Sequence, residues 1–373
     1  MAKLIDITGR ALSGEWGIDD ETGDGVPVLR TTNFTNEGVV NYNDVITRTI
    51  TKKNIDQKFL RKGDIIIEKS GGSDKFPVGR VIYFDGDENT YLFNNFTGLL
   101  RVKDKKIWNS KYVFYSLFAN YRRGGTRAFE NKTTGIHNLK TDDFVSRFDI
   151  YELPIKEQNL ICEKLDKIYN IIKLRRQELL ILDDLIKARF VEMFGDVKHE
   201  EKYKGIPLRE LCITMSGGTP STKNTEYYEG NIPWITTVSL GPNHIDGSTA
   251  KGYITQDAIK NSATKLIPAG NILFGTRVGV GKSSINDVDI CTNQDIIAII
   301  GIDENRFNRV FIKHVLDDYQ PYYDSLKKGA TILGITSDDL KDTLIPDVSL
   351  DVQTEFVAFV DQVDKSELVE ESD

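Results

Sequence analysis

The chain has 373 residues, of which 39% are hydrophobic and 28% charged, and its formal net charge is −8 at pH 7. This length predicts two or three domains, and the composition is that of an ordinary water-soluble globular protein. No apolar stretch approaches the roughly 20 residues that span a bilayer, and the N-terminus lacks the apolar segment of a signal peptide, so we expect neither a membrane protein nor an exported one.

The negative charge is concentrated at the C-terminus, and the cysteines are isolated. Residues 1–150 carry 23 Lys and Arg against 20 Asp and Glu, whereas residues 346–373 carry 1 against 9. The rest of the chain therefore stays compatible with nucleic-acid binding, although charge alone does not predict it. Cys162, Cys212 and Cys291 form no C-x-x-C pair, which is typical of reduced thiols in a cytoplasmic protein.

Residues 1–152 are predicted to form a mixed α/β domain. Early in this part stands VPVLRTTNF (26–34), an apolar strand with a proline that ends in a pair of threonines. In LRKGDIIIEKSGG (60–72), a glycine turn precedes a short buried strand, which ends in a polar, glycine-rich loop. Two further segments, NLKTDDF (138–144) and LPIKEQNLICEKLDKI (153–168), close the domain and begin a helix.

Residues 153–195 are predicted to form one long coiled-coil helix. Pro154 marks its start and Gly195 its end, and neither glycine nor proline occurs in between. Apolar side chains recur in alternating steps of four and three residues, at Ile161, Leu165, Ile168, Ile172, Leu179, Leu182, Ile186 and Met193. Arg175 and Arg189 occupy the two remaining positions of this seam and can lay their aliphatic stems along it. A helix of this length extends roughly 60 Å.

Residues 196–347 repeat the first domain, segment by segment and in the same order. The counterparts are IPWITTVSL (232–240), IPAGNILFGTRVG (267–279), GITSDDL (334–340) and SLDVQTEFVAFVDQV (349–363). The distance between matching segments shrinks steadily from 206–207 residues to 195, as differences in loop length would require. We therefore predict a duplicated chain; Trp234, in the repeated strand, is expected to pack in the core.

A second, shorter helix is predicted in residues 348–373, followed by the acidic tail. A shift of 195 residues places Phe356, Val360 and Val363 on the first three seam positions of the long helix, and the apolar pattern then stops at Glu367. Either half of the long seam is covered from outside this chain, or the second helix is truncated. The predicted fold class is α+β, with two similar domains, a long helix between them and an approximate two-fold arrangement if the helices are antiparallel.

The run FGTRVGVGKSS (274–284) ends like a nucleotide-binding loop, but the rest of the pattern argues against one. Thr276 stands where the first glycine of G-x-x-x-x-G-K-[ST] is required. The matching segment of the first domain, EKSGGSDKFPVGR (68–80), has no such motif. Residues 284–287 read as a turn and a strand, and not as the helix whose N-terminus would hold phosphate.

Other catalytic patterns are missing from the sequence. There is no N/D-P-P-Y/F loop of a DNA amino-methyltransferase and no G-x-S-x-G. Glu68 and Lys69 are adjacent, whereas a metal-dependent nuclease core with Asp64 would need Glu-x-Lys. The histidines are scattered without metal-ligand spacing, at His137, His199, His244 and His314. We expect no catalysis, no metal and no cofactor in this chain.

Basic and amide side chains on glycine-bearing loops are the residues from which DNA readers are built. The first domain offers Lys69, Ser70, Arg122, Arg123, Arg127, Lys132 and Asn138. The second offers Thr276, Arg277, Lys282, Lys327 and Lys328. A role for these side chains as ordinary solvated surface groups stays open for each of them.

The run SGGTPSTKNTEYYEGNIPWI (216–235) resembles the start of a target recognition domain in the specificity subunits of type I restriction–modification enzymes. The helix entry LPIKEQ (153–158) and exit ARFVEMFGD (188–196) are similar to that family as well, and the resemblance covers essentially the whole chain. The first domain departs from it, with ALSGEWGIDDETGDG (11–25) in place of G-T-P-S. The second helix is also shorter than is usual in the family.

The resemblance implies a non-catalytic, DNA-binding subunit. Each domain would read half of a split double-stranded target in the major groove, with Thr219, Ser221 and Lys223 added as contacts. Two methyltransferase subunits would dock on the helices, and a motor-nuclease subunit would join for cleavage. S-adenosylmethionine, ATP and Mg²⁺ would belong to those partners. Two alternatives stay open, a fragment of a fused restriction–methylation enzyme and an assembly or decoy subunit that binds no DNA; the helices could also mediate self-association.

Overall fold

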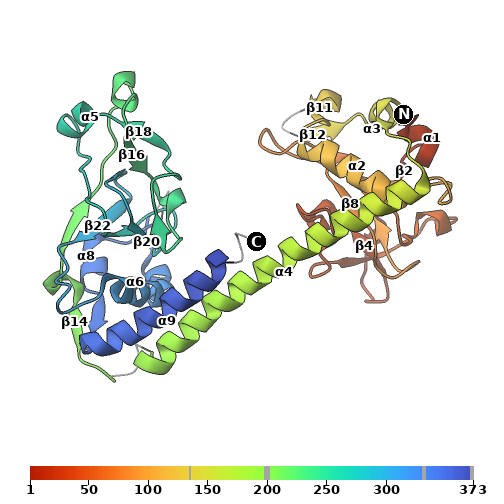
Figure 1. Ribbon diagram of the computed structural model, residues 1–373. Coiled ribbons are helices and arrows are strands. Elements are labelled where there is room, and N and C mark those ends of the chain that lie inside the picture. Colours follow the sequence, from red (N-terminus) through yellow and green to blue (C-terminus); the bar gives the residue numbers. More distant parts are fainter. Residues whose placement is uncertain (134–135, 197–201, 330–332, 370–373) are drawn as a thin grey trace. The chain divides into compact units, whose positions relative to one another are not determined.

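The computed structural model describes residues 1–133, 136–196, 202–329 and 333–369 (Figure 1). The chain divides into two compact units, Met1–Leu174 and Arg175–Asp373. Among the described residues, no helix is both long enough and apolar enough to cross a membrane.

The first unit is built from three small sheets and one two-stranded pair, with helices beside them. The central sheet has the order β2 (Leu12–Ser13), β10 (Thr97–Leu100), β6 (Ile65–Glu68) and β8 (Val81–Tyr83). The second sheet has the order β3 (Ile18–Asp19), β5 (Ile46–Thr49), β4 (Val26–Leu29) and β9 (Leu92–Phe93). The third has the order β11 (Glu130–Thr133), β12 (Ile136–Leu139) and β7 (Ser70–Gly71). Strand β6 is buried on both faces, which its unbroken Ile65–Ile67 run requires.

Short elements complete the first unit. Strand β1 (Ala2–Lys3) pairs with β13 (Asp149–Ile150), so that the two ends of the domain meet. The helices are α1 (Leu4–Thr8), α2 (Ser110–Arg122) and α3 (Thr141–Arg147). Helix α2 packs against β8, because its apolar face, with Val113 and Leu117, is buried in the same cluster as Val81.

The second unit repeats this plan. Its central sheet has the order β15 (Ile213–Ser216), β22 (Ile296–Ile300), β19 (Ile272–Gly275), β20 (Ser283–Asn286) and β17 (His244–Ile245). The smaller sheets are β18 (Gly252–Ile254), β16 (Ile232–Ile235) and β21 (Cys291–Thr292), and the pair β14 (Gly205–Pro207) and β23 (Leu344–Pro346). The helices are α5 (Gln256–Lys260), α6 (Arg309–Asp318), α7 (Gln320–Leu326), α8 (Ser337–Lys341) and α9 (Leu350–Val369).

The duplication extends to the register of the strands. In the central sheets, Leu99 pairs with Ile66 in the first unit, and Ala298 pairs with Leu273 at the matching positions of the second. Strands β4 and β9 run parallel, and so do β16 and β21. A common register, and not only a common order of elements, confirms the prediction of two similar mixed α/β domains.

A buried glutamine attaches helix α4 (Ile155–Phe194) to the first domain. The side chain of Gln158 is only 1% exposed. Its Nε2 donates to the carbonyls of Ile107 and Leu153 at 2.9 and 2.8 Å, and its Oε1 accepts from the backbone N–H of Asn109 at 2.9 Å. Every polar atom of this side chain is thereby used to hold the turn before α2.

The same clamp recurs in the second domain. Gln353, at the start of α9, is 0% exposed and donates to the carbonyls of Arg306 and Val348 at 3.1 and 2.9 Å. Its Oε1 accepts from the backbone N–H of Asn308 at 2.8 Å. Because Gln158 and Gln353 bind matching turns with the same atoms, α9 is the counterpart of the start of α4. It has 20 residues against 40, as the shorter second helix of the prediction requires.

The last turns of α4 belong to the core of the second unit. Ile186, Phe190 and Phe194 are buried there with Phe356 and Val360 of α9. The rings of Phe194 and Phe356 lie 5.6 Å apart, edge to face. Packing of this kind stabilises a helix pair strongly, because each aromatic ring removes a large apolar area from water.

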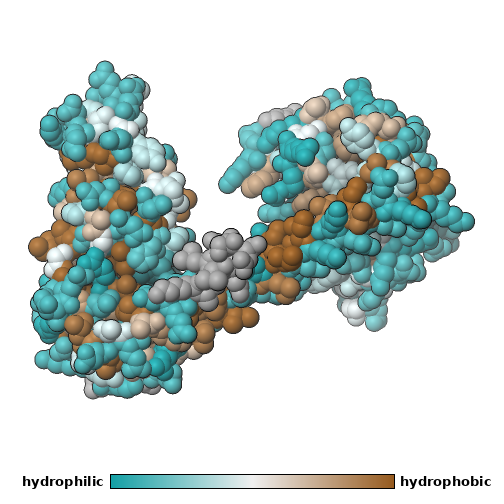
Figure 2. Space-filling model, in the orientation of Figure 1, coloured by the Kyte–Doolittle hydropathy of each residue, from teal (hydrophilic) through white to brown (hydrophobic). Residues whose placement is uncertain are grey.

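The predicted seam residues fall into three groups. In the second unit, Ile186, Phe356, Val360 and Val363 are buried, and Leu182 and Met193 pack against the same core. In the first unit, Ile161 is half-buried. Between these, the apolar side chains of Leu165, Ile168, Ile172 and Leu179 are exposed, together with Ile171, Leu174, Leu180 and Ile181, and Figure 2 shows hydrophobic residues along α4.

Candidate nucleic-acid interface

In the first domain, the predicted DNA-contacting residues are gathered around the sheet of β7, β12 and β11. Ser70 on β7 pairs with Asn138 on β12, and the Ser70 hydroxyl donates to Oδ1 of Asn138 at 2.5 Å. Lys132 lies on β11, opposite His137. The hairpin of β11 and β12 and the sequence-distant strand β7 therefore meet at the end of the buried strand β6.

Lys69 lies between β6 and β7 and is held in place by its own hydrogen bond. Its ammonium group donates to the hydroxyl of Ser13 at 2.7 Å. Partial burial lowers the pKa of Lys69 below its usual range, because desolvation disfavours the charged form. A lysine that is partly desolvated and fixed in this way is prepared for a nearby anion.

Three arginines follow the C-terminal end of α2, and all three side chains are exposed. Arg122 and Arg123 come at the end of the helix. Arg127 donates through Nη2 to the carbonyls of Asp74 and Lys75, at 3.2 and 3.3 Å. These acceptors are backbone carbonyls, so the positive charge of Arg127 is not neutralised by them.

In the second domain, the matching loops meet in the same register. Arg277 bridges Gly334, at the positions that Ser70 and Asn138 occupy in the first domain. Lys328 bridges the same glycine from its other side. The loop after β19 and the segment between α7 and α8 are therefore joined by backbone pairing, as β7 and β12 are.

The loop after β19 presents two cations and one buried threonine. Arg277 is exposed and lies 3.6 Å from the carboxylate of Asp295, and Lys282 is exposed. Thr276 corrects the prediction for this loop, because its side chain is only 6% exposed and its hydroxyl donates to the carbonyl of Asp295 at 3.0 Å. Thr276 holds the loop in place and does not present itself to a partner.

The loop that carries G-T-P-S-T lies beside β16. Ser221 and Lys223 are exposed, and the exposed Thr219 donates its hydroxyl to Oε1 of Gln294 at 2.5 Å. Trp234 packs in the core as expected, and its indole N–H donates to the carbonyl of Gly218 at 3.1 Å. This tryptophan therefore anchors the loop to the core.

The two lysines after α7 differ. Lys327 is half-buried and forms an ion pair with Asp324, which lowers the pKa of that carboxyl group. Lys328 is exposed. Because the charge of Lys327 is already balanced, we expect Lys328 to contribute more to the attraction of an anionic partner.

Two anchoring residues were not predicted from the sequence. Gln294 bonds Thr219, and Asp295 bonds both the backbone N–H and the hydroxyl of Thr276. Both precede β22, so one short turn connects the loop of Ser221 and Lys223 with that of Arg277 and Lys282. No spacing in the sequence marks this connection, since it depends on two strands that pair in space.

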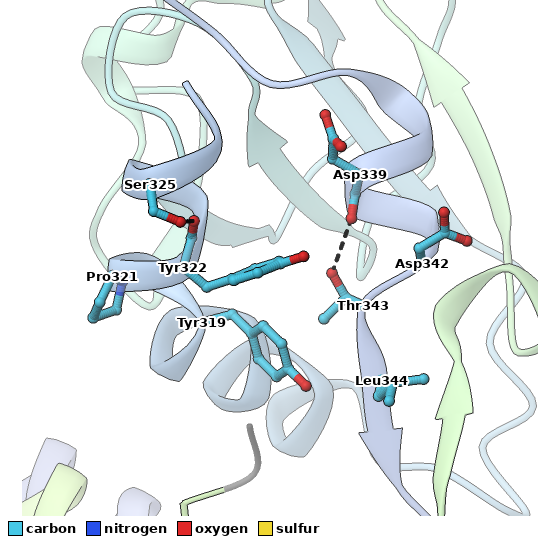
Figure 3. Close-up of a pocket in the computed structure, with 8 residues that line it drawn as sticks. All are labelled: Tyr319, Pro321, Tyr322, Ser325, Asp339, Asp342, Thr343 and Leu344. Carbon is cyan, nitrogen blue, oxygen red and sulfur yellow. Dashed lines mark hydrogen bonds between the residues drawn. The ribbon is translucent and has the colours of Figure 1, made fainter. Parts of the chain in front are cut away.

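A cavity of about 580 Å³ lies elsewhere in the second domain, between α7, α8 and β23 (Figure 3). Its carboxylates are already engaged, since Asp339 caps α8 through Thr336 and Asp342 forms an ion pair with Arg209. Two of its hydroxyls also bond neighbouring carbonyls, with Ser325 donating to Tyr322 at 2.7 Å and Thr343 donating to Asp339 at 3.4 Å. None of the residues predicted to contact DNA lines this cavity.

The titratable groups of the described residues do not gather into a metal or catalytic cluster. Among the described residues, no three His, Cys, Asp or Glu side chains are grouped as metal ligands. His137 lies between two carboxylates, Glu130 at 3.2 Å and Asp74 at 3.7 Å. His244 pairs with Asp287 at 2.8 Å, and His199 lies outside the described residues. Burial raises the pKa of Cys162 to about 11, so this thiol is not a nucleophile at neutral pH.

Comparison with known proteins assigns these two domains. Residues 2–182 and 200–372 match the family described as the type I restriction modification DNA specificity domain. The chain is 33% identical over 164 residues to the EcoR124I/EcoR124II specificity subunit of Escherichia coli, covering 42% of this chain and 40% of that protein. It is 29% identical over 140 residues to the MjaIX specificity subunit of Methanocaldococcus jannaschii, covering 37% of this chain and 32% of that protein.

Solved structures show the same fold. A type I restriction-modification S subunit from M. genitalium superimposes with a TM-score of 0.59 at 16% identity, over 100% of this chain and 90% of that one. A chain from a structure on complex assembly and conformational transition of a type I R-M system gives 0.54 at 16% identity, over 99% and 90%. The sequence matches to the two curated relatives span 40% and 32% of their lengths.

Proposed function

Because the chain belongs to the family of the type I restriction modification DNA specificity domain, we propose that it is the non-catalytic subunit that selects the DNA target of a restriction–modification complex. Each domain reads one half of a split double-stranded sequence. The observation that carries this proposal is the paired loop arrangement, in which Ser70–Asn138 and Arg277–Gly334 occupy the same register in the two domains. Equivalent loops that carry different side chains suit two readers of different half-sites.

Long-range electrostatics and base contacts would have separate roles. The exposed cations Arg122, Arg123, Lys223, Lys282 and Lys328 attract the phosphate backbone and set the orientation of the domains on it. Amide and guanidinium groups, such as those of Asn138 and Arg277, have the geometry to read base edges. A good bidentate contact of this kind discriminates against a wrong base pair by roughly 1–3 kcal/mol.

The helices would serve assembly and spacing. Two weak half-site readers on one rigid connection gain from a high effective concentration whenever the spacing of the half-sites matches. The exposed apolar side chains of α4, among them Ile168 and Ile172, are the surface on which two methyltransferase subunits dock. A motor-nuclease subunit joins for cleavage, the complex works in the cytoplasm, and S-adenosylmethionine, ATP and Mg²⁺ are bound by the partners.

The decisive experiment is methylome mapping by single-molecule sequencing in cells that express this chain with its methyltransferase subunits. We expect one split methylated motif that disappears when the chain is omitted. Replacing the second-domain contacts Arg277 and Lys282 with alanine should change or abolish only one half of the motif, whereas Arg122→Ala with Arg123→Ala should affect the other half. A methylation pattern that is independent of this chain would refute the proposal.

Deletion of one heptad from the exposed part of α4, residues 168–174, tests the role of the helix. Seven residues shorten a helix by roughly 10 Å, the rise of about three base pairs. The deletion keeps the apolar pattern in phase. We therefore expect the preferred distance between half-sites to change while both half-sites keep their sequences. An unchanged distance would contradict a spacing role for the helix.

A further inference from the structure

The loop between β19 and β20 contains a valine in an unfavourable backbone conformation. Val278 has φ +41°, in the left-handed region. Among the described residues, the other non-glycine residues with positive φ are Asn54 and Asn89, which belong to the type that tolerates this region. A β-branched residue there is a genuine outlier, because its side chain crowds the backbone.

The loop that carries this valine is closed by its own hydrogen bonds. The N–H of Gly275 donates to the carbonyl of Lys282 at 2.9 Å, and the N–H of Gly281 donates back to Gly275 at 2.9 Å. The N–H of Lys282 donates to the carbonyl of Gly279 at 3.1 Å. Val278 therefore sits at the tip of a small, defined loop whose two ends are fixed.

The first domain shows what the same position looks like without a side chain. The counterpart of Val278 is Gly71, with φ +147°, where an added Cβ would lie 2.4 Å from Oε1 of the buried Glu68. The counterpart of Glu68 is Gly275. The second domain thus has Gly and Val where the first has Glu and Gly, which places an apolar group on the loop. An added Cβ at Gly275 would lie 2.8 Å from the carbonyl oxygen of Gly279, so the loop backbone fills the space that the Glu68 side chain takes in the first domain.

Packing within the chain does not account for this valine. Its side chain is 55% exposed, and it belongs to none of the buried clusters. The exposed cations Arg277 and Lys282 flank it. Backbone strain that brings no burial is a feature of ligand-contacting segments. An apolar side chain between two cations is complementary to a ligand in which an apolar group lies between phosphates.

We propose that Val278 is a specificity-determining residue that packs against the 5-methyl group of a thymine in the major groove. This inference rests on the proposed function, and it specifies which base, and which group of that base, the second domain contacts. The thymine methyl is the one apolar feature that the major groove displays, and apolar side chains recognise it. Arg277 and Lys282 would bind the phosphates or base edges on either side, and the closed loop would hold the isopropyl group in position.

The experiment compares thymine with uracil, which lacks only that methyl group. Once methylome mapping has defined the target, the full chain with its methyltransferase subunits is titrated with duplexes that carry a single thymine-to-uracil change in the second-domain half-site. We expect one position at which the wild type loses about four-fold in affinity, the effect of one buried methyl group. Val278→Gly should bind the thymine and uracil duplexes equally, because it has no side chain to contact the methyl group.

The possible outcomes separate the two proposals. A melting temperature of Val278→Gly at or above that of the wild type would show that the variant folds and that the strain is relieved. If Val278→Gly retains the wild-type difference between thymine and uracil at every position, or if the wild type shows no such difference, Val278 does not read a thymine methyl. If the complex prefers no sequence over random duplex, the proposed function itself fails.

Discussion

The turn before α2 in the first domain and the turn before α6 in the second have the same hydrogen bond between an aspartate side chain and the backbone. Their exposed side chains differ in the sign of their net charge. In the first domain, Asp104 accepts from the backbone N–H of Lys106 at 2.8 Å; in the second, Asp303 accepts from that of Asn305 at 3.1 Å. The exposed side chains at this turn are Lys103, Asp104, Lys105, Lys106 and Ile107 in the first domain and Asp303, Glu304, Asn305 and Arg306 in the second, so three cations and one anion in the first turn correspond to one cation and two anions in the second.

Hydrogen bonds to the backbone define the framework of both turns and leave their surface side chains free to differ. Gln158 and Gln353 clamp this turn identically, since their partners are main-chain groups that every residue possesses. Side chains that point into water are under no such requirement. The two copies can therefore keep one scaffold while their surfaces come to suit different partners or different DNA sequences.

Among matching positions of the two domains, Phe356 and Ile161 should differ most in the stability that each side chain contributes. The two positions are 195 residues apart. Phe356→Ala removes a fully buried ring that contacts Phe190 and Phe194, and should lower the free energy of unfolding by about 4 kcal/mol. Ile161→Ala, at a half-buried position, should lower it by about 1 kcal/mol. Urea unfolding of the two variants measures the difference, and equal losses would show that the two helices pack alike.

The glutamine clamps should be equivalent. Gln158→Leu and Gln353→Leu keep the approximate volume but leave a buried backbone N–H and two carbonyls without their partner, so each should destabilise its own domain by about 3 kcal/mol. Hydrogen exchange should rise around residues 105–113 in the first variant and around residues 304–312 in the second. A change that spreads equally over both domains in either variant would contradict two independent clamps.

Acid should destabilise the second domain more than the first through His314. Burial beside Lys313 lowers the pKa of His314 to about 4, whereas the unfolded chain titrates near 6.5. Between these values the unfolded state binds more protons, so stability falls as the pH is lowered, by about 2 kcal/mol from pH 7 to pH 5.

The matching residue of the first domain provides the control for this effect. Tyr115 occupies the position of His314, and His314→Tyr should remove the loss below pH 6.5. Unfolding in urea at pH 7, 6 and 5 measures it. An identical pH dependence of the variant and the wild type would assign the acid sensitivity to other groups.

The smallest effect on stability is expected in the middle of α4. Ile168→Ser and Ile172→Ser change side chains that are already exposed, so the free energy of unfolding of the chain alone should change by less than about 0.5 kcal/mol. Leu174→Ser is the matched exposed control off the seam. If the seam is a docking surface, the seam variants weaken copurification of the methyltransferase subunits and the control does not. Equal copurification of all three would place docking elsewhere.

Most of the architecture could be predicted from the sequence because its signals are local and periodic. The long helix runs from Ile155 to Phe194, where a heptad repeat between Pro154 and Gly195, interrupted only by Arg175 and Arg189, predicted it. The internal repeat predicted two domains with one topology, since matching segments must form matching strands. The exposure of Arg277 and Lys282 also follows, because charged side chains on a glycine-rich loop remain in water.

The site was less predictable, because its details depend on partners distant in the chain. Thr276 has the polarity of a DNA contact, yet its hydroxyl is bonded to Asp295, 19 residues further on. Asn138 meets Ser70 across a separation of 68 residues. Such pairs follow from strand register, which a single sequence does not display.

By itself, the sequence determined that the chain is duplicated, that one helix is long and the other short, and that no familiar catalytic motif is present. Only the tertiary structure decided which residues in the last turns of α4 are buried. The heptad places Arg189 and Met193 on the seam, whereas the core buries Phe190 and Phe194. An α-helix has 3.6 residues per turn, so a seven-residue repeat drifts around a straight helix, and the rings of Phe311 and Phe356 select the positions that face them.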